Sequence, residues 1–149
     1  MGKLSVSCTS VALGSYPCVT LSGVSALDVV DETFLAVAPA RVAAAMATRS
    51  RWRTWWPDLT LALHDDRGPA GLRWQVTGEL RGSMEVWLEP VLDGTVLHYF
   101  LRAEVADAAA PELVAAARTR RLSAKTLAFA LKAELEAGRP AGQAPERER

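Results

Sequence analysis

Two adjacent residues, His98 and Tyr99, carry the side chains best suited to proton transfer in this sequence. Either side chain can act as a general acid or base when it reaches the reacting group. Because strand side chains alternate between faces, Tyr99 belongs to an apolar face and His98 to the opposite one, beside Arg102 and Glu104. A single β-bulge would reverse that phase. Tyr99 and His98 are therefore the only weak catalytic candidates, and no spacing is typical of a catalytic triad.

Metal, redox and phosphate chemistry have little support. The two histidines, His64 and His98, are too few for a histidine-rich metal site. Cys8 and Cys18 match no zinc or redox spacing, and a disulfide between them would join the N-terminal segment only to itself. No glycine-rich phosphate loop is present. We therefore expect no metal and no cofactor.

Three of the five tryptophans, Trp52, Trp55 and Trp56, gather immediately before Pro57. On a helix, residues three and four apart share a face, so the three rings are expected on roughly one side. Pro57 ends the helix, since the residue before a proline avoids helical geometry. Such a cluster either plugs one end of the core or lines the entrance of a cavity, and both interpretations stay open.

Composition excludes several classes of partner. Lysine plus arginine and aspartate plus glutamate number 17 each, so the net charge indicates neither nucleic acid nor an anionic membrane. No segment approaches the ~20 apolar residues of a membrane span, so stable membrane insertion is not expected. We expect a cytoplasmic protein.

The 149 residues suffice for one domain with a sizeable core. Residues 1–25 are rich in Ser, Thr, Gly and Val, and we expect a disordered extension, with a translation start near Val24 as one explanation. A weak targeting leader is the alternative. Residues 26–138 form the expected domain, and residues 139–149, rich in Pro, Gly and charge, an expected disordered tail.

The order of elements predicts an α+β fold. A first strand is expected over 26–37, helical structure from Pro39 to about Ser50 and into the tryptophan cluster, and a long helix over 111–137. Turn signals, among them Asp93-Gly94, separate four further strands over 59–64, 72–80, 83–91 and 95–105.

Each of these four strands has an apolar face that needs cover. The predicted inner face comprises Leu59, Leu61, Leu63, Leu72, Trp74, Val76, Met84, Val86, Leu88, Leu97, Tyr99 and Leu101. The last helix has a matching stripe of Leu113, Ala117, Ala124, Leu127, Ala128, Leu131 and Leu135. We predict a curved antiparallel sheet wrapped around a long C-terminal helix, with short helices after the first strand. Asp31 and Thr33 are further candidates for its inner side.

The outer face of the sheet has two unusual residues, Trp87 and Phe100, among charged residues expected to form cross-strand ion pairs. Exposed rings on neighbouring strands indicate a homodimer contact or a cover from the N-terminal segment. A basic stripe of Arg118, Arg121, Lys125 and Lys132 is expected along the solvated face of the last helix, with an acidic partner as the alternative.

Three phrases carry a family resemblance: Trp55-Trp56-Pro57-Asp58-Leu59, the segment 82–90 (GSMEVWLEP) and the segment 93–99 (DGTVLHY). With the order of elements, residues 26–138 resemble the START-like, or helix-grip (SRPBCC), superfamily, nearest its small bacterial polyketide cyclase/dehydrase-like branch. The resemblance implies a cavity between sheet and long helix that holds an apolar molecule.

Our leading hypothesis is a carrier or sensor of a lipid-like or polyketide-like molecule. Its predicted ligand-binding residues are Trp52, Trp55, Trp56, Leu61, Leu63, Trp74, Val76, Met84, Val86, Tyr99, Leu101, Leu127 and Leu131. The alternatives are a cyclase or dehydratase, and a protein-interaction module built on Trp87 and Phe100.

Overall fold

The computed structural model describes residues 24–106, 108–139 and 143. Residues 1–23 of the expected extension, with Cys8 and Cys18, lie outside the described residues, and so does most of the expected tail. All of the helices and strands of the predicted domain lie within the described part of the chain.

Five antiparallel strands form one sheet in the order β1-β5-β4-β3-β2. The first strand, β1 (Val24–Leu35), pairs with the last, β5 (Gly94–Ala106). The sheet continues through β4 (Arg81–Val91) and β3 (Gly71–Gly78) to β2 (Leu59–Asp66). The two edges of the sheet are therefore β1 and β2.

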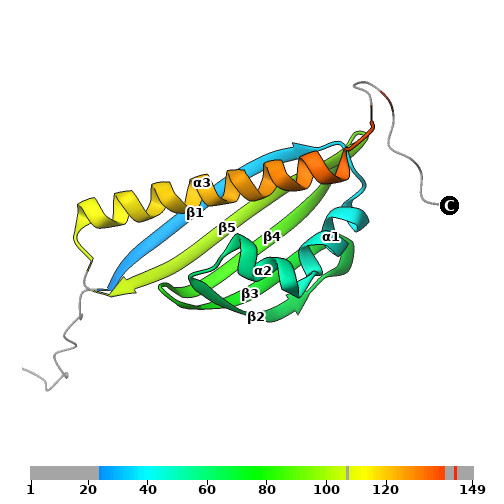
Figure 1. Cartoon of the computed structure of the whole chain (residues 1–149). Helices are drawn as coiled ribbons and strands as arrows, with labels where there is room; N and C mark the ends of the chain where they lie inside the picture. The colour runs from blue at the N-terminus through cyan, green and yellow to red at the C-terminus, as the bar shows by residue number, and fades with distance from the viewer. Residues whose placement is uncertain (1–23, 107, 140–142, 144–149) are drawn as a thin grey trace, which may run out of the picture.

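Three α-helices lie on one face of this sheet (Figure 1). The short helices α1 (Pro39–Ala47) and α2 (Arg49–Trp55) follow β1, and α1 packs over β3 and β4. The long helix α3 (Ala110–Leu135) runs along β1 and β5. A 3-10 turn, η1 (Gly68–Ala70), joins β2 to β3. The predicted α+β fold, a curved sheet gripping a C-terminal helix, is confirmed.

The inner face of the sheet is the core, as the alternation predicts. The hydrophobic residues at most 1% exposed on β3, β4 and β5 are Leu72, Trp74, Val76, Met84, Val86, Leu88, Leu97, Tyr99 and Leu101. Helix α3 covers this face with Ala124, Leu127, Ala128 and Leu131. Burial of so many apolar side chains at about 25 cal/mol per Å² is the main stabilising contribution to the fold.

The edge strand β2 is less well covered than the sequence predicts. Leu63 lies opposite the buried Trp74, on the inner face, yet is 36% exposed. Leu59 and Leu61 are half-buried. These residues of β2 are partly exposed because β2 is an edge strand. Helix α3 covers the opposite edge of the sheet, and the register of β2 shifts after Leu63.

The β4–β5 hairpin differs from the expected Asp93-Gly94 turn. Leu92 and Asp93 form the two-residue turn, and Leu92 adopts a positive φ of 51°. Gly94 begins β5, where an added Cβ would lie 2.3 Å from the carbonyl oxygen of Leu35. This glycine therefore allows β1 and β5 to approach closely rather than forming the turn.

Candidate functional site

The tryptophan cluster divides at the end of α2. Trp52 and Trp56 are buried and pack on Trp74, with ring centroids 5.6 and 5.9 Å away. Trp55 is half-buried and meets Trp56 edge to face at 5.6 Å. The helix ends at Trp55, and Trp56, before Pro57, has a non-helical φ of −135°, yet all three rings lie in or against the same core.

An open groove of about 460 Å³ lies between α2 and α3. Its walls are Thr54, Trp55, Thr119, Leu122, Ser123, Thr126, Leu127 and Ala130. Leu127 belongs both to this groove and to the buried core, so the floor of the groove touches the interior. The volume falls within the range of small-molecule sites.

The hydroxyl groups that α3 contributes to the groove already donate hydrogen bonds. Thr119, Ser123 and Thr126 each donate to the backbone carbonyl four residues earlier, at 3.1, 3.0 and 2.9 Å. No side chain that lines the groove is an acid, a histidine, a lysine or an arginine. The groove therefore offers apolar contact and a few acceptor oxygens, and nothing that transfers a proton at neutral pH.

Two arginine–carboxylate pairs bracket the groove. Arg51 of α2 donates to both carboxylate oxygens of Glu134 on α3, at 2.8 and 2.7 Å. Toward the opposite end of α3, Arg120 donates to both oxygens of Asp58, with Nη1 3.0 Å from Oδ1. We call these the exposed ion pair and the buried ion pair, since the arginine side chains are 33% and 10% exposed.

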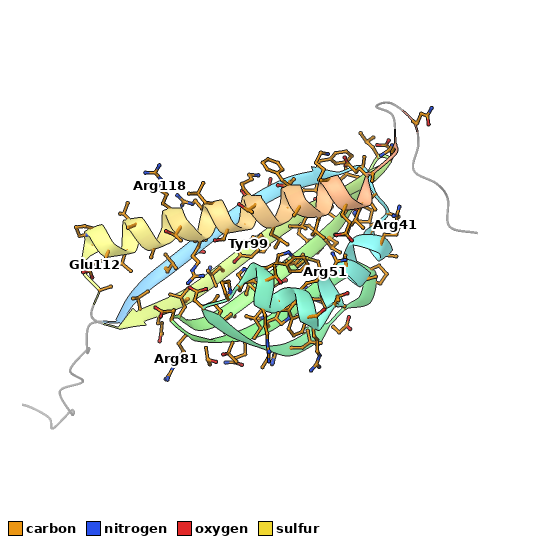
Figure 2. The ribbon with its side chains drawn as sticks, in the orientation of Figure 1. Arg41, Arg51, Arg81, Tyr99, Glu112 and Arg118 are labelled. Carbon is orange, nitrogen blue, oxygen red and sulfur yellow. The ribbon has the colours of Figure 1, made fainter. Side chains whose placement is uncertain are left out.

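The buried ion pair lies next to the Tyr99 phenol. Burial raises the pKa of Tyr99 far above its ordinary value, while the neighbouring Trp56 indole and the charge of Arg120 oppose that rise. The hydroxyl donates to the sulfur of Met84 at 3.2 Å, a weak acceptor. Figure 2 shows Tyr99 on the sheet between α3 and α2. A phenol with so high a pKa is a poor proton donor or acceptor near neutral pH.

Two buried donors near this position form no regular hydrogen bond within the described part of the chain. They are the indole N–H groups of Trp56 and Trp74. By contrast, Trp52 donates to the carbonyl oxygen of Met46 at 2.8 Å. Unsatisfied buried donors are uncommon, and each costs free energy unless an acceptor is supplied. Of these two, the Trp74 indole N–H is the donor left without an acceptor, because the Trp56 N–H faces the Tyr99 oxygen.

Sequence reasoning missed Arg120 and Asp58. Arg120 falls three residues after Ala117 and four before Ala124, so it occupies a position of the apolar stripe on α3. A charged residue at such a position is the signal that could have identified it. The residue is 8% exposed, and its hydrogen bonds, with its charge, hold the pKa of Asp58 below the ordinary value.

His98 lies on the outer face of the sheet, away from the groove. Its ring stacks on Trp87 at 4.5 Å, and its two nitrogens lie 3.0 and 2.9 Å from carboxylate oxygens of Glu32 and Glu89. The expected neighbours Arg102 and Glu104 are not its partners, because the partners come from the adjacent strands β1 and β4. The β4–β5 register is regular throughout, so no bulge turns His98 inward.

The other predicted ligand-binding residues occupy three environments. Trp55 and Leu127 line the groove, and Leu61 lies at a second hollow beside α2. Leu63 is exposed on β2. The remainder form the core: Trp52, Trp56, Trp74, Val76, Met84, Val86, Tyr99, Leu101 and Leu131. Their contact with a ligand stays a prediction.

The inward-facing polar residues of β1 contact α3 rather than the groove. Lys125 Nζ lies 3.1 Å from a carboxylate oxygen of Asp31 and donates to Thr33 Oγ1 at 2.9 Å. Over the described residues, no set of three or more His, Cys, Asp and Glu side chains is arranged to hold a metal. In the same part of the chain, no helix has the length and apolar character to cross a membrane.

Comparison with known proteins identifies the fold. No family model matches the chain, and no curated protein matches it in sequence. The solution structure of the Aha1 dimer from Colwellia psychrerythraea matches with a TM-score of 0.57 and 14% identity, over 76% of this chain and 99% of that one. The crystal structure of the Mll3558 protein from Rhizobium loti matches with a TM-score of 0.56 and 16% identity, over 72% and 98%. At these identities the likeness shows a shared fold, of the helix-grip type.

Proposed function

We propose that this protein binds an apolar small molecule, lipid-like or polyketide-like, in the groove between α2 and α3. The observation that carries the proposal is the groove itself, about 460 Å³ with mostly apolar walls and a floor that reaches the core at Leu127. Concave apolar sites with few polar groups are typical of small-molecule binding.

Trp55 is the proposed gate of this site. It forms one wall of the groove, and its ring contacts Trp56, which in turn contacts Trp74. A ligand that displaces the Trp55 ring would extend its apolar contact toward the core. The predicted core residues then act as the inner part of the same site.

A carrier or sensor fits the geometry better than a cyclase or dehydratase. The groove walls contain no titratable side chain, Tyr99 is buried with a raised pKa, and His98 lies on the opposite face of the sheet. An enzyme of that type would need an acid or base in contact with its substrate.

A pair of alanine substitutions on α3 tests the groove. Ala130 lines the groove and Ala133, one turn further along and also exposed, does not. We expect Ala130→Phe to fill the site and weaken the binding of the neutral dye Nile red at least about tenfold, with Ala133→Phe within about twofold of the wild type. Fluorescence titration measures both, and native mass spectrometry detects any retained ligand. Equal affinities in the two variants would contradict the proposal.

A homodimer through the outer face of the sheet is a separate proposal. Trp87, Phe34 and Val30 are 40, 39 and 51% exposed there, and Phe100 lies among them. Apolar side chains gathered on one face are typical of an association surface. Sedimentation velocity at increasing concentration would show a dimer that Trp87→Ala dissociates, and a wild-type monomer throughout would refute it.

A further inference from the structure

The strongest unexplained feature of the molecule is a cation inside a helix–sheet interface. The Arg120 side chain is 10% exposed at an apolar-stripe position of α3, whereas the side chain of its partner Asp58 is 40% exposed at the end of the loop after α2. Replacing a buried ion pair by apolar residues is often neutral or stabilising, so stability alone does not favour an arginine at this position. The carboxylate is thus the solvent-facing member of the pair, and the guanidinium is the buried one.

The groups near Arg120 include hydrogen-bond donors without a strong acceptor, so these surroundings favour a ligand that supplies one. The Tyr99 hydroxyl donates only to a thioether sulfur, and the indole N–H group of Trp74, which packs on Trp56, has no acceptor in the described part of the chain. The Asp58 carboxylate is the one strong acceptor that the structure places on Arg120. A planar carboxylate matches the two-pronged guanidinium better than a point charge does.

We propose that Arg120 binds the carboxylate of an apolar acid, which takes the position of Asp58 while its apolar body lies in the groove. This inference rests on the proposed function and names the class of its ligand. The groove walls Thr119 and Ser123 flank Arg120 along α3, and Trp55 precedes Asp58 by three residues. The head group is thus placed next to the groove, whose walls do not themselves include Arg120 or Asp58.

The exposed ion pair is a poorer anchor. The Arg51 and Glu134 side chains are 33 and 51% exposed, so water and salt screen their interaction with a ligand charge. Arg120, at 10%, lies where a charge-assisted hydrogen bond is stronger. The structure thus provides an internal comparison between two arginines at the two ends of one groove.

The test measures the preference for an acid over the matching alcohol. Decanoate with decanol represents acyl chains, and anthracene-2-carboxylate with 2-(hydroxymethyl)anthracene represents polycyclic acids, each titrated calorimetrically into the full chain below micelle concentrations. For at least one pair, we expect the wild type to bind the acid about tenfold more tightly than the alcohol. The pair that shows this preference identifies the shape of the ligand.

The variants assign that preference to one residue. Arg120→Met should abolish it while the alcohol still binds, and Asp58→Asn should strengthen acid binding alone, because the competing charge is gone. Arg118→Met and Arg51→Met are the controls and should keep the preference. Arg118 points away from the sheet (Figure 2). Circular dichroism checks that each variant is folded, and Asp58→Asn tests the proposal even if Arg120→Met does not fold.

Three results would overturn the Arg120 anchor. They are equal affinity of the wild type for acid and alcohol, loss of the preference in a control variant instead of in Arg120→Met, and no gain in Asp58→Asn. In these cases the alcohols still bind, and the groove remains a binding site. If no acid and no alcohol binds any form of the protein, the proposed function itself fails.

Discussion

At the residue scale, the chemistry of the molecule is concentrated in the buried ion pair rather than in the residues suited to catalysis. Tyr99 is locked into the core and His98 is held between two carboxylates on the other face of the sheet. Arg120 and Asp58 instead join α3 to the loop after α2, beside the groove. Because replacing a buried ion pair by apolar residues is often neutral or stabilising, the proposed binding role gives Arg120 a reason that stability alone does not.

The buried ion pair predicts a specific pH dependence of stability. Arg120 lowers the pKa of Asp58 in the folded state, so the pair stabilises the protein above the unfolded pKa of about 3.9 and loses that contribution as the pH falls through the folded value. We expect the wild type to lose more free energy of unfolding than Asp58→Asn as the pH falls below about 5. Urea denaturation at stepped pH values measures the difference.

The Arg120→Met background is the control for this prediction. Without the guanidinium, the largest cause of the lowered pKa is absent while burial, which raises the pKa of Asp58, remains, so the effect of Asp58→Asn on the slope of stability against pH should vanish or reverse. Identical slopes for the wild type and Asp58→Asn in the native background would mean that Asp58 and Arg120 do not interact in solution.

At the element scale, α3 is fixed on one side and free on the other. The expected basic stripe is divided: Arg118 and Arg121 are exposed, whereas two lysines reach across to the edge strand β1. Lys125 donates to the carbonyl oxygen of Glu32 at 2.7 Å, and Lys132 to that of Phe34 at 3.2 Å. Two residues of the expected solvated stripe are thus exposed, and the other two connect α3 to β1. The side of α3 that faces α2 meets the groove instead.

Removing one of these tethers should loosen α3. Lys125→Met leaves the Asp31 carboxylate, 13% exposed, without its cation, and we expect a loss of about 1–3 kcal/mol in the free energy of unfolding. Arg121→Met, at an exposed position on the same helix, should change it by less than about 0.5 kcal/mol. Chemical denaturation compares the two variants. Equal effects would show that the Lys125 contacts add nothing to stability.

Periodic burial explains which parts of the fold could be predicted from the sequence. The inner positions of β3, β4 and β5 and the stripe on α3 follow from periods of two and 3.6 residues, which hold wherever an element is half-covered. Leu63 shows the limit of this reasoning. Alternation predicts the face of the sheet on which its side chain lies, but not whether another element covers that part of an edge strand. Arg120 could not be identified from periodicity, because a charged residue interrupts the apolar pattern by which the stripe is recognised.

Local geometry explains the part of the site that could not be predicted. Whether Trp55 joins the core or the groove depends on which residue ends α2, and boundaries are the least certain part of any sequence pattern. The pairing of Arg120 with Asp58 joins residues 62 positions apart and depends on how α3 lies against the loop after α2. No local spacing encodes that arrangement.

At the scale of the whole molecule, the sheet separates two surfaces. One face carries the groove between α2 and α3, and the other carries the patch of Trp87, His98 and Phe100. Binding in the groove and association through the outer patch therefore use different residues. A substitution on one face should leave the other function intact.

The central claim is that an apolar molecule binds between α2 and α3. The most direct test is to titrate isotopically labelled protein with decanoate and with decanol and to follow the backbone amides and indole N–H groups by NMR. The account predicts that the shift changes concentrate at residues 54–55 and 119–130, with the Trp55 indole among them. Changes confined to Trp87, His98 and Phe100, or no change at saturating ligand, would contradict it.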